Sequence, residues 1–186
     1  MDIWRELQNG GESGAQRLVS EYGDRLLSAA MLLCRDKGDA EDLVFRTLDR
    51  AIRKIGTYRP TGSFFAWLYA ILLNFHRMDA RRRRPEPMPE AMARGDLPAP
   101  SDGAEDWSPS AAADRAAVRE AVLRLPPALR ETVVLRLFGG LSTEDVARAC
   151  GVPPGTVKSR LFHAKEALRA ALLGNADPDT GKGTTA

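Results

Sequence analysis

Apolar residues recur every three or four positions along the first half of the chain, which is the period of one face of an α-helix. The spacing predicts a helix over the apolar positions Leu18–Leu33, after a break at Gly10–Gly14. A second helix is predicted over Asp39–Ile55. Ser63 is a good N-cap for a third helix, which Pro85 ends. These segments predict a compact bundle of roughly three or four helices.

The same period returns in the second half of the chain, where the segments are shorter and sharply bounded. Helices are predicted over residues 111–125, 128–138, 142–150 and 154–172. Ser142, with Asp145 three residues later, is similar to a capping box, and Gly151-Val152-Pro153 predicts a tight turn before the last helix. That helix carries one apolar stripe, formed by Val157, Leu161, Ala164, Leu168 and Leu172.

Pro, Ala and acidic residues dominate the segment between the two halves, which has no sustained apolar period. We therefore predict an all-α protein with two small helical domains, residues 1–84 and 114–173, joined by a flexible acidic linker over residues 85–113. Residues 174–186 are predicted to be a disordered tail.

Charge is distributed unevenly along the chain. There are 15 Lys and Arg against 11 Asp and Glu in residues 1–84, 1 against 6 in the linker, and 11 against 8 in residues 114–186. Two mildly basic blocks therefore flank an acidic one, which suits two domains that bind a polyanion.

The sequence argues against several classes of function. Cys34 and Cys150 lie far apart without CxxC spacing, and His76 and His163 are also distant, so no zinc site is predicted. Paired catalytic carboxylates, a nucleophile elbow and a phosphate-binding glycine loop are not visible, so we expect neither an enzyme nor a cofactor. The N-terminus does not resemble a signal peptide, and no stretch approaches the ~18 apolar residues that span a bilayer. A cytoplasmic protein without membrane insertion is expected.

Residues 141–169, LSTEDVARACGVPPGTVKSRLFHAKEALR, have the layout of a helix-turn-helix. The second helix of such a unit fits the roughly 12 Å wide major groove, with its N-terminal side chains at base edges. The candidate DNA-binding residues are Thr156, Lys158, Ser159, Arg160 and His163. Two packed helices with a solvated basic face are the alternative, but cap, turn and charge coincide here and favour DNA binding.

Residues 58–84 combine aromatic rings with polar and cationic side chains, a combination that holds single-stranded nucleic acid. The candidates are Tyr58, Arg59, Ser63, Phe64, Asn74, Arg77 and Arg81. Trp67, at helical spacing in this segment, is expected in the core rather than against a base. The Arg81–Arg84 run alone is weak evidence, because cations also offset the negative dipole at a helix C-terminus.

Residues 125–169 resemble the second conserved domain of bacterial sigma factors, and GTVKSRLFHAKEALR is particularly similar to the extracytoplasmic-function (ECF) type. Residues 39–84 resemble the first conserved domain of the same family. There, DAEDLVFRTLDRAIRKI is similar to the polymerase-binding helix and GSFFAWLYAILLNFHRMDARRRR to the minus-ten-binding helix. The resemblance implies a subunit that docks on core RNA polymerase, recognises the minus-ten and minus-thirty-five promoter elements and promotes DNA melting.

The resemblance also implies roles for individual segments. The helix-turn-helix would read the minus-thirty-five element, and the loop of residues 56–63 with the following helix would bind the minus-ten element. Asp39, Asp42 and Leu43 would grip a coiled coil of the large polymerase subunit, although Asp39 can also be interpreted as a helix N-cap. Promoter DNA, core RNA polymerase and an anti-sigma protein are the implied partners of a chain that is a monomer when free.

The chain departs from the family at a few positions. Phe45 and Arg46 stand where the family commonly has Gln and an acid, Leu48 where it has an aromatic residue, and His163 where it usually has Arg. Phe45 is expected to face solvent and expose apolar area, which indicates an altered protein contact.

Alternatives stay open. The acidic linker either threads the basic channel of the polymerase, as the family implies, or is an inert tether. The chain could be an ordinary transcriptional regulator whose residues 1–84 dimerise or bind an effector, and tight duplex binding without polymerase would favour that. It could also be an inactive sigma-like protein that sequesters a partner, and polymerase binding without promoter-directed transcription would favour that.

Overall fold

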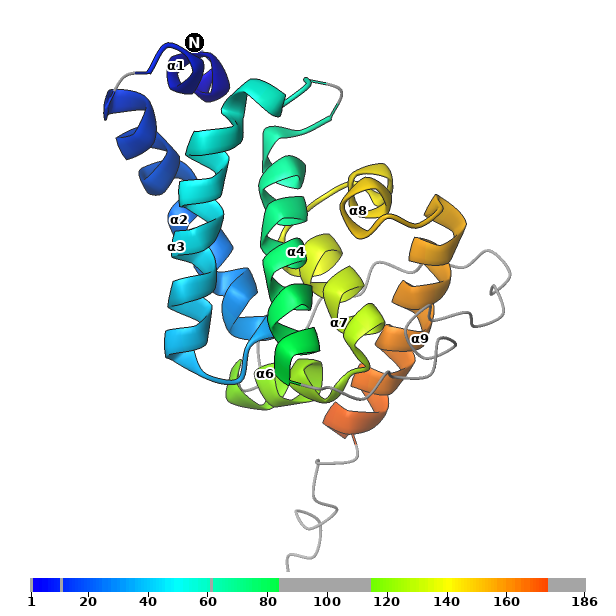
Figure 1. Ribbon diagram of the computed structural model, residues 1–186. Helices are drawn as coiled ribbons and strands as arrows, with labels where there is room; N and C mark the ends of the chain where they lie inside the picture. Colours follow the sequence, from blue (N-terminus) through cyan, green and yellow to red (C-terminus); the bar gives the residue numbers. More distant parts are fainter. Residues whose placement is uncertain (1, 11, 61, 84–114, 174–186) are drawn as a thin grey trace, which may run out of the picture.

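The computed structural model describes residues 2–10, 12–60, 62–83 and 115–173, and these ranges are helical apart from short connections (Figure 1). The N-terminal unit, described between residues 2 and 83, contains α1 (Ile3–Gln8), α2 (Glu12–Leu33), α3 (Lys37–Lys54), the 3₁₀ turn η1 (Ile55–Thr57) and α4 (Phe64–Arg83). The C-terminal unit, residues 115–173, contains α6 (Arg115–Arg124), α7 (Pro127–Val133), the π-helical turn η2 (Val134–Phe138), α8 (Thr143–Cys150) and α9 (Pro154–Leu173). The predicted linker, 85–113, and tail, 174–186, lie outside the described residues.

The start of α3 differs from the prediction. Asp36 is the N-cap, because its side chain accepts a hydrogen bond from the Asp39 backbone N–H at 3.1 Å. Asp39 therefore lies in the first helical turn, where a carboxylate still meets the positive end of the helix dipole. The interpretation of Asp39 as the cap is wrong, since the helix already begins at Lys37.

The other boundaries of the N-terminal unit follow local chemistry to different degrees. The Ser63 cap of α4 is confirmed, since its Oγ accepts a hydrogen bond from the Ala66 N–H at 3.0 Å. In contrast, α2 begins at Glu12, inside the predicted break. The sequence pattern does not reveal α1, because its 6 residues are too few to show a helical period; buried Ile3 and Leu7 hold it on the unit.

Local signals set the boundaries of the C-terminal unit. Pro127 stands in the first turn of α7, and Ser142 caps α8 by accepting a 3.1 Å hydrogen bond from the Asp145 N–H. Gly151 ends α8 in the left-handed conformation, at φ 72°. The apolar stripe of α9 packs inward, and its fully buried members are Val157, Ala164 and Leu168. The predicted helices of this unit are confirmed, except that α7 continues as a π-helical turn.

The two units pack against each other and share one hydrophobic core. Figure 1 shows α7 and α8 beside α4, and further contacts join α2 to α6 and to η2. The units are therefore not independent of each other in this structure, and their packing decides which candidate residues are exposed.

Candidate nucleic-acid interface

A short, hydrogen-bonded turn joins α8 to α9 in the helix-turn-helix. The Gly151 and Val152 N–H groups both donate to the Ala147 carbonyl, at 2.9 and 3.0 Å. Pro153 follows, and Pro154 is the first residue of α9. Because proline fixes its φ angle, the turn is stiff where α9 begins. The first turns of α9 are thus held as a DNA-reading helix requires.

The candidate DNA-binding residues of α9 fall into two groups. Lys158 is exposed, and Thr156 and His163 are partly exposed. Ser159 and Arg160 are only 4% and 3% exposed, so neither side chain is offered to DNA in this conformation. For Arg160, helical geometry explains the burial, because this residue flanks the inward stripe of α9.

Phe162 is an exposed ring on α9 that the sequence-based candidates leave out. Its side chain is 42% exposed and packs edge-on against the His163 ring, with centroids 5.4 Å apart. It lies four residues after Lys158 and therefore shares that residue's face of the helix. The available sequence signal is that Phe162 falls outside the apolar stripe.

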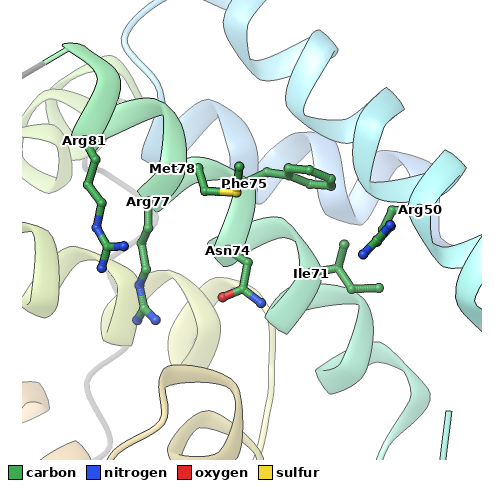
Figure 2. A pocket seen from close by; sticks show the side chains of 7 residues that line it. All are labelled: Arg50, Ile71, Asn74, Phe75, Arg77, Met78 and Arg81. Atoms are coloured by element: carbon green, nitrogen blue, oxygen red, sulfur yellow. The ribbon is translucent and has the colours of Figure 1, made fainter. Parts of the chain in front are cut away.

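A groove lies along α4 and extends to Arg50 of α3 (Figure 2). Its volume is about 570 Å³, and its lining consists of Arg50, Ile71, Asn74, Phe75, Arg77, Met78 and Arg81. The structure brings together three sequence-based candidates here, Asn74, Arg77 and Arg81, because steps of three and four residues share a helix face. Arg50 joins them only through the packing of α3 on α4, which no local pattern shows.

Arg77 of this groove is paired with the C-terminal unit. Its Nε donates to Glu131 Oε1 at 3.1 Å, and its Nη2 donates to Glu131 Oε2 at 2.5 Å and to the Cys150 carbonyl at 3.4 Å. Glu131 is only 5% exposed. Hydrogen bonding to this carboxylate raises the pKa of Arg77 against the lowering effect of desolvation, so the guanidinium stays charged.

The loop before α4 divides its candidates between core and surface. Tyr58 and Phe64 are buried, with their rings edge-to-face and centroids 5.1 Å apart. Trp67 is partly buried and stacks on Phe64 with ring centroids 5.5 Å apart, so it packs against the core at its edge. Arg59 and Ser63 are exposed. A ligand can therefore reach Arg59 and Ser63, whereas Tyr58 and Phe64 would first have to leave the core.

The three candidates for polymerase binding on α3 lie in different environments. Asp39 accepts two 2.7 Å hydrogen bonds from Arg83, at the end of α4, and this pairing lowers the pKa of Asp39. Asp42 is exposed and accepts a 3.1 Å bond from Arg46. Leu43 is fully buried, so its side chain supports the core rather than a surface.

Two of the departures from the family on α3, Arg46 and Phe45, have different structural contexts. Arg46 donates to Asp79 at 2.8 Å, and its guanidinium lies over the Phe75 ring, 4.6 Å from the centroid. This network accounts for an arginine at position 46. Phe45 is 72% exposed, which confirms that it faces solvent.

Cys34 is half-buried, with its Sγ 4.0 Å from His76 Nδ1, and Cys150 is buried. Burial raises the pKa of Cys34 and of Cys150 to about 11, so both thiols are protonated at neutral pH. Within residues 2–10, 12–60, 62–83 and 115–173, no group of three or more His, Cys, Asp and Glu could hold a metal ion. None of the helices in those ranges has the length and apolar character needed to cross a membrane.

Comparison with known proteins identifies both units. Residues 18–86 match the model of sigma-70 region 2, and residues 115–168 match that of sigma-70 region 4. The chain is 32% identical over 173 residues to the RNA polymerase sigma-H factor of Pseudomonas aeruginosa, covering 89% of this chain and 90% of that protein. The chain belongs to the sigma-70 family.

Its type follows from further similarities. It is 34% identical over 160 residues to the ECF RNA polymerase sigma factor EcfG of Rhodopseudomonas palustris, covering 86% of each chain. Among solved structures, CnrH in complex with the cytosolic domain of CnrY matches with a TM-score of 0.69 and 25% identity, over 94% of this chain and 97% of that one. RpoE in complex with the anti-sigma factor NepR, from Bartonella quintana, matches with a TM-score of 0.67 and 27% identity, over 89% and 99%. The chain is thus an ECF sigma factor that recognises promoters, as the sequence predicted.

Proposed function

We propose that this sigma factor reads promoter DNA with two surfaces and binds core RNA polymerase with a third. The α4 groove binds the minus-ten element as its strands separate, and the exposed face of α9 binds the minus-thirty-five element in the major groove. The outer face of α3 docks on the coiled coil of the large polymerase subunit. The polymerase supplies the catalysis, and this chain catalyses no reaction itself.

The lining of the α4 groove is the observation that carries the minus-ten assignment. Three guanidinium groups line the groove and can bind the phosphates of a DNA strand; they belong to Arg50, Arg77 and Arg81. Apolar side chains beside them can contact the bases; these are Ile71, Phe75 and Met78. Asn74 is exposed and carries both a donor and an acceptor for a base edge. Arg59 and Ser63, which are exposed in the loop before α4, would add further contacts to this element.

On α9, the accessible residues suit contact with a duplex. Lys158 pairs with a phosphate or a guanine edge, and Thr156 and His163 offer hydrogen bonds. Phe162 adds an apolar ring that can touch a thymine methyl group. Ser159 and Arg160 are buried in the present conformation, so they can contact DNA only if the residues that cover them move away.

On α3, Asp42 and Phe45 form the accessible part of the proposed polymerase contact. Asp42 supplies a carboxylate, and Phe45 supplies a large exposed apolar ring beside it. Phe45→Gln, which restores the residue common in the family, is expected to weaken retention on immobilised core polymerase. Val19→Gln, at a residue of α2 that is 53% exposed and lies outside this surface, serves as the control.

The similarity to chains solved with CnrY and with NepR supports an anti-sigma protein as a further partner. We expect the free chain to be a monomer that acts where the polymerase acts, in the cytoplasm.

Run-off transcription tests the proposal directly. Core polymerase with this chain is given genomic fragments, beginning with the region upstream of its own gene, and the start site is mapped. Arg81→Ala and Lys158→Ala should each lower the transcript by about tenfold. Arg124→Ala, an exposed arginine of α6 outside both surfaces, should not.

Altered templates separate the two DNA surfaces. On a template with a scrambled minus-thirty-five element, the effect of Lys158→Ala should disappear while that of Arg81→Ala persists. A chain that fails to join the core enzyme, or joins it without conferring promoter choice, would overturn the proposal.

A further inference from the structure

Phe75 contributes an aromatic ring to the lining of the α4 groove. The ring is half-buried, and Figure 2 shows it extending from α4 toward Arg50 of α3. A ring in this place offers a flat apolar face to an unpaired base. Such a ring binds a base well only if its orientation is fixed beforehand, because ordering a side chain during binding costs free energy.

Arg46 of α3 lies against the Phe75 ring from outside this lining. Its guanidinium carbon is 4.6 Å from the ring centroid, within the range of a cation–π contact. Nη1 and Nη2 of Arg46 donate to the two carboxylate oxygens of Asp79, at 2.8 and 3.3 Å. Nη1 also donates to Asp42, at 3.1 Å. Two carboxylates, one on each helix, thus hold the guanidinium over the ring.

The pair of Arg46 and Asp79 is partly shielded from solvent. The two side chains are 29% and 26% exposed, so salt and water screen their attraction only in part. Hydrogen bonding to Asp79 raises the pKa of Arg46 against the lowering effect of desolvation, so the guanidinium stays charged. Asp79 lies one helical turn after Phe75 on α4. The same helix therefore supplies the ring and the carboxylate that keeps the arginine over it.

We propose that Arg46 is a positioning residue of the minus-ten site, which holds the Phe75 ring in the orientation that stacks on an unpaired base. The inference rests on the proposed function of the α4 groove. Arg46 itself need not touch DNA, since it acts from behind the ring. Its contribution to binding therefore depends on the presence of the ring.

A double-mutant cycle in the holoenzyme tests this dependence. Core polymerase is saturated with the wild-type chain, Arg46→Met, Phe75→Ala or the double variant. The probe is the labelled non-template strand of the minus-ten region, taken from a promoter mapped by run-off transcription, and fluorescence anisotropy measures its binding. Arg17→Met is the matched control, because Arg17 of α2 pairs in the same way with Glu21 one turn away and with Glu6 of a neighbouring helix, outside the groove.

Phe75→Ala should weaken binding of the strand by about tenfold, within the range for one base stacked on an aromatic ring. Arg46→Met should weaken it by about fivefold in the wild-type background and by no further factor once Phe75 is replaced. Arg17→Met should leave the affinity unchanged. Equal losses from Arg46→Met in both backgrounds would overturn the proposal, since Arg46 would then act without the ring. A loss no larger than that of Arg17→Met would also overturn it.

Asp79→Asn gives a second measurement that leaves the arginine in place. It weakens the hold of α4 on the guanidinium, so it should lower the affinity for the strand in the wild-type background but not in Phe75→Ala. Wild-type affinity in Asp79→Asn would contradict the proposed positioning. If Phe75→Ala does not fold, Phe75→Leu, which keeps apolar volume but has no aromatic face, replaces it in the cycle.

Arg81→Ala in the same assay distinguishes failure of the inference from failure of the proposed function. If Arg81→Ala weakens binding of the strand and Arg46→Met does not, the groove binds DNA and only the role of Arg46 is lost. If neither Arg81→Ala nor Phe75→Ala weakens it, the groove does not bind the minus-ten element, and both ideas fail.

Discussion

The N-terminal unit is packed with aromatic rings, whereas the C-terminal unit is packed with aliphatic and small side chains. Around the start of α4, rings from α1, α2 and the loop meet in one cluster, formed by Trp4, Tyr22, Tyr58, Phe64, Phe65 and Trp67. In residues 115–173, the phenylalanines are Phe138 and Phe162, which are 41% and 42% exposed. The core there is built from residues such as Val146, Ala147 and Val157, which let helices approach closely.

This difference shows how the two proposed DNA-binding surfaces are built. In the N-terminal unit, the large rings hold the loop before α4 in place. Tyr58 and Phe64 therefore pack in the core, even though the composition of residues 58–84 suggests base stacking. In the C-terminal unit, small core residues position the helix-turn-helix and leave Phe162 on the surface. Most aromatic rings described in the N-terminal unit therefore pack inside, with Phe45 as an exception, whereas both phenylalanines of residues 115–173 are exposed.

The difference between the two units should be largest when a phenylalanine is replaced by alanine in each of them. Phe64→Ala should lower the free energy of unfolding by about 3–5 kcal/mol, because it leaves a cavity in the aromatic cluster. Phe162→Ala should stay within about 0.5 kcal/mol, because the ring is on the surface. Urea unfolding of the two variants measures the difference, and equal losses would mean that Phe64 does not support the cluster.

A change at Gly139 tests how tightly the units approach each other. A β-carbon there would stand 2.6 Å from the Leu135 carbonyl oxygen and 3.0 Å from the Tyr69 ring across the interface. Gly139→Ala should therefore cost about 1–3 kcal/mol of unfolding free energy. Gly155→Ala on α9, where nothing lies within 4 Å, should instead stabilise by about 0.5–1 kcal/mol. Thermal unfolding that ranks the two in the reverse order would contradict the close approach.

The helix caps should behave alike in both units despite the different cores. Ser63→Ala and Ser142→Ala each remove a side-chain acceptor for a backbone N–H and should cost about 1 kcal/mol. Ser28→Ala, in the middle of α2, is the control, since that hydroxyl bonds only to the Asp24 carbonyl within the helix. Ser63→Asp should restore the stability that Ser63→Ala loses. If it restores the stability but not the transcription initiation, the Ser63 hydroxyl also contacts DNA.

The smallest effect concerns the pH dependence of stability. Burial lowers the pKa of His76, so the unfolded chain binds a proton more readily than the folded chain. The free energy of unfolding should therefore fall as the pH drops from about 6.5 toward the lowered pKa of the folded state. In His76→Gln this slope should be reduced, as measured by urea unfolding between about pH 7 and 5. An unchanged slope would mean that titratable groups other than His76 cause the pH dependence.

Much of the fold follows from the sequence because its signals act over a few residues. The caps at Ser63 and Ser142, the turn at Gly151 and the stripe of α9 all lie within one or two helical turns of the residues they organise. Errors occur where such signals compete or are too short. Asp36 and Asp39 both suit an N-cap, and α1 is too brief to show a period.

The candidate site was predictable in part for the same reason. Asn74, Arg77 and Arg81 share one face of one helix, so the sequence places them together. Arg50 enters the groove from α3, and Arg46 is explained by Asp79 of α4. Such partners lie far apart in the chain, and helical periodicity carries no information about which helices will be neighbours.

The sequence by itself therefore determined the all-α class, most helix boundaries, the helix-turn-helix and the family, since each depends on local backbone chemistry or on ordered motifs. Tertiary structure alone decided that Tyr58 and Phe64 are packed inside and that Glu131 takes hold of Arg77. Exposure and pairing depend on which distant surface arrives at a side chain, and only the packed chain brings those surfaces together.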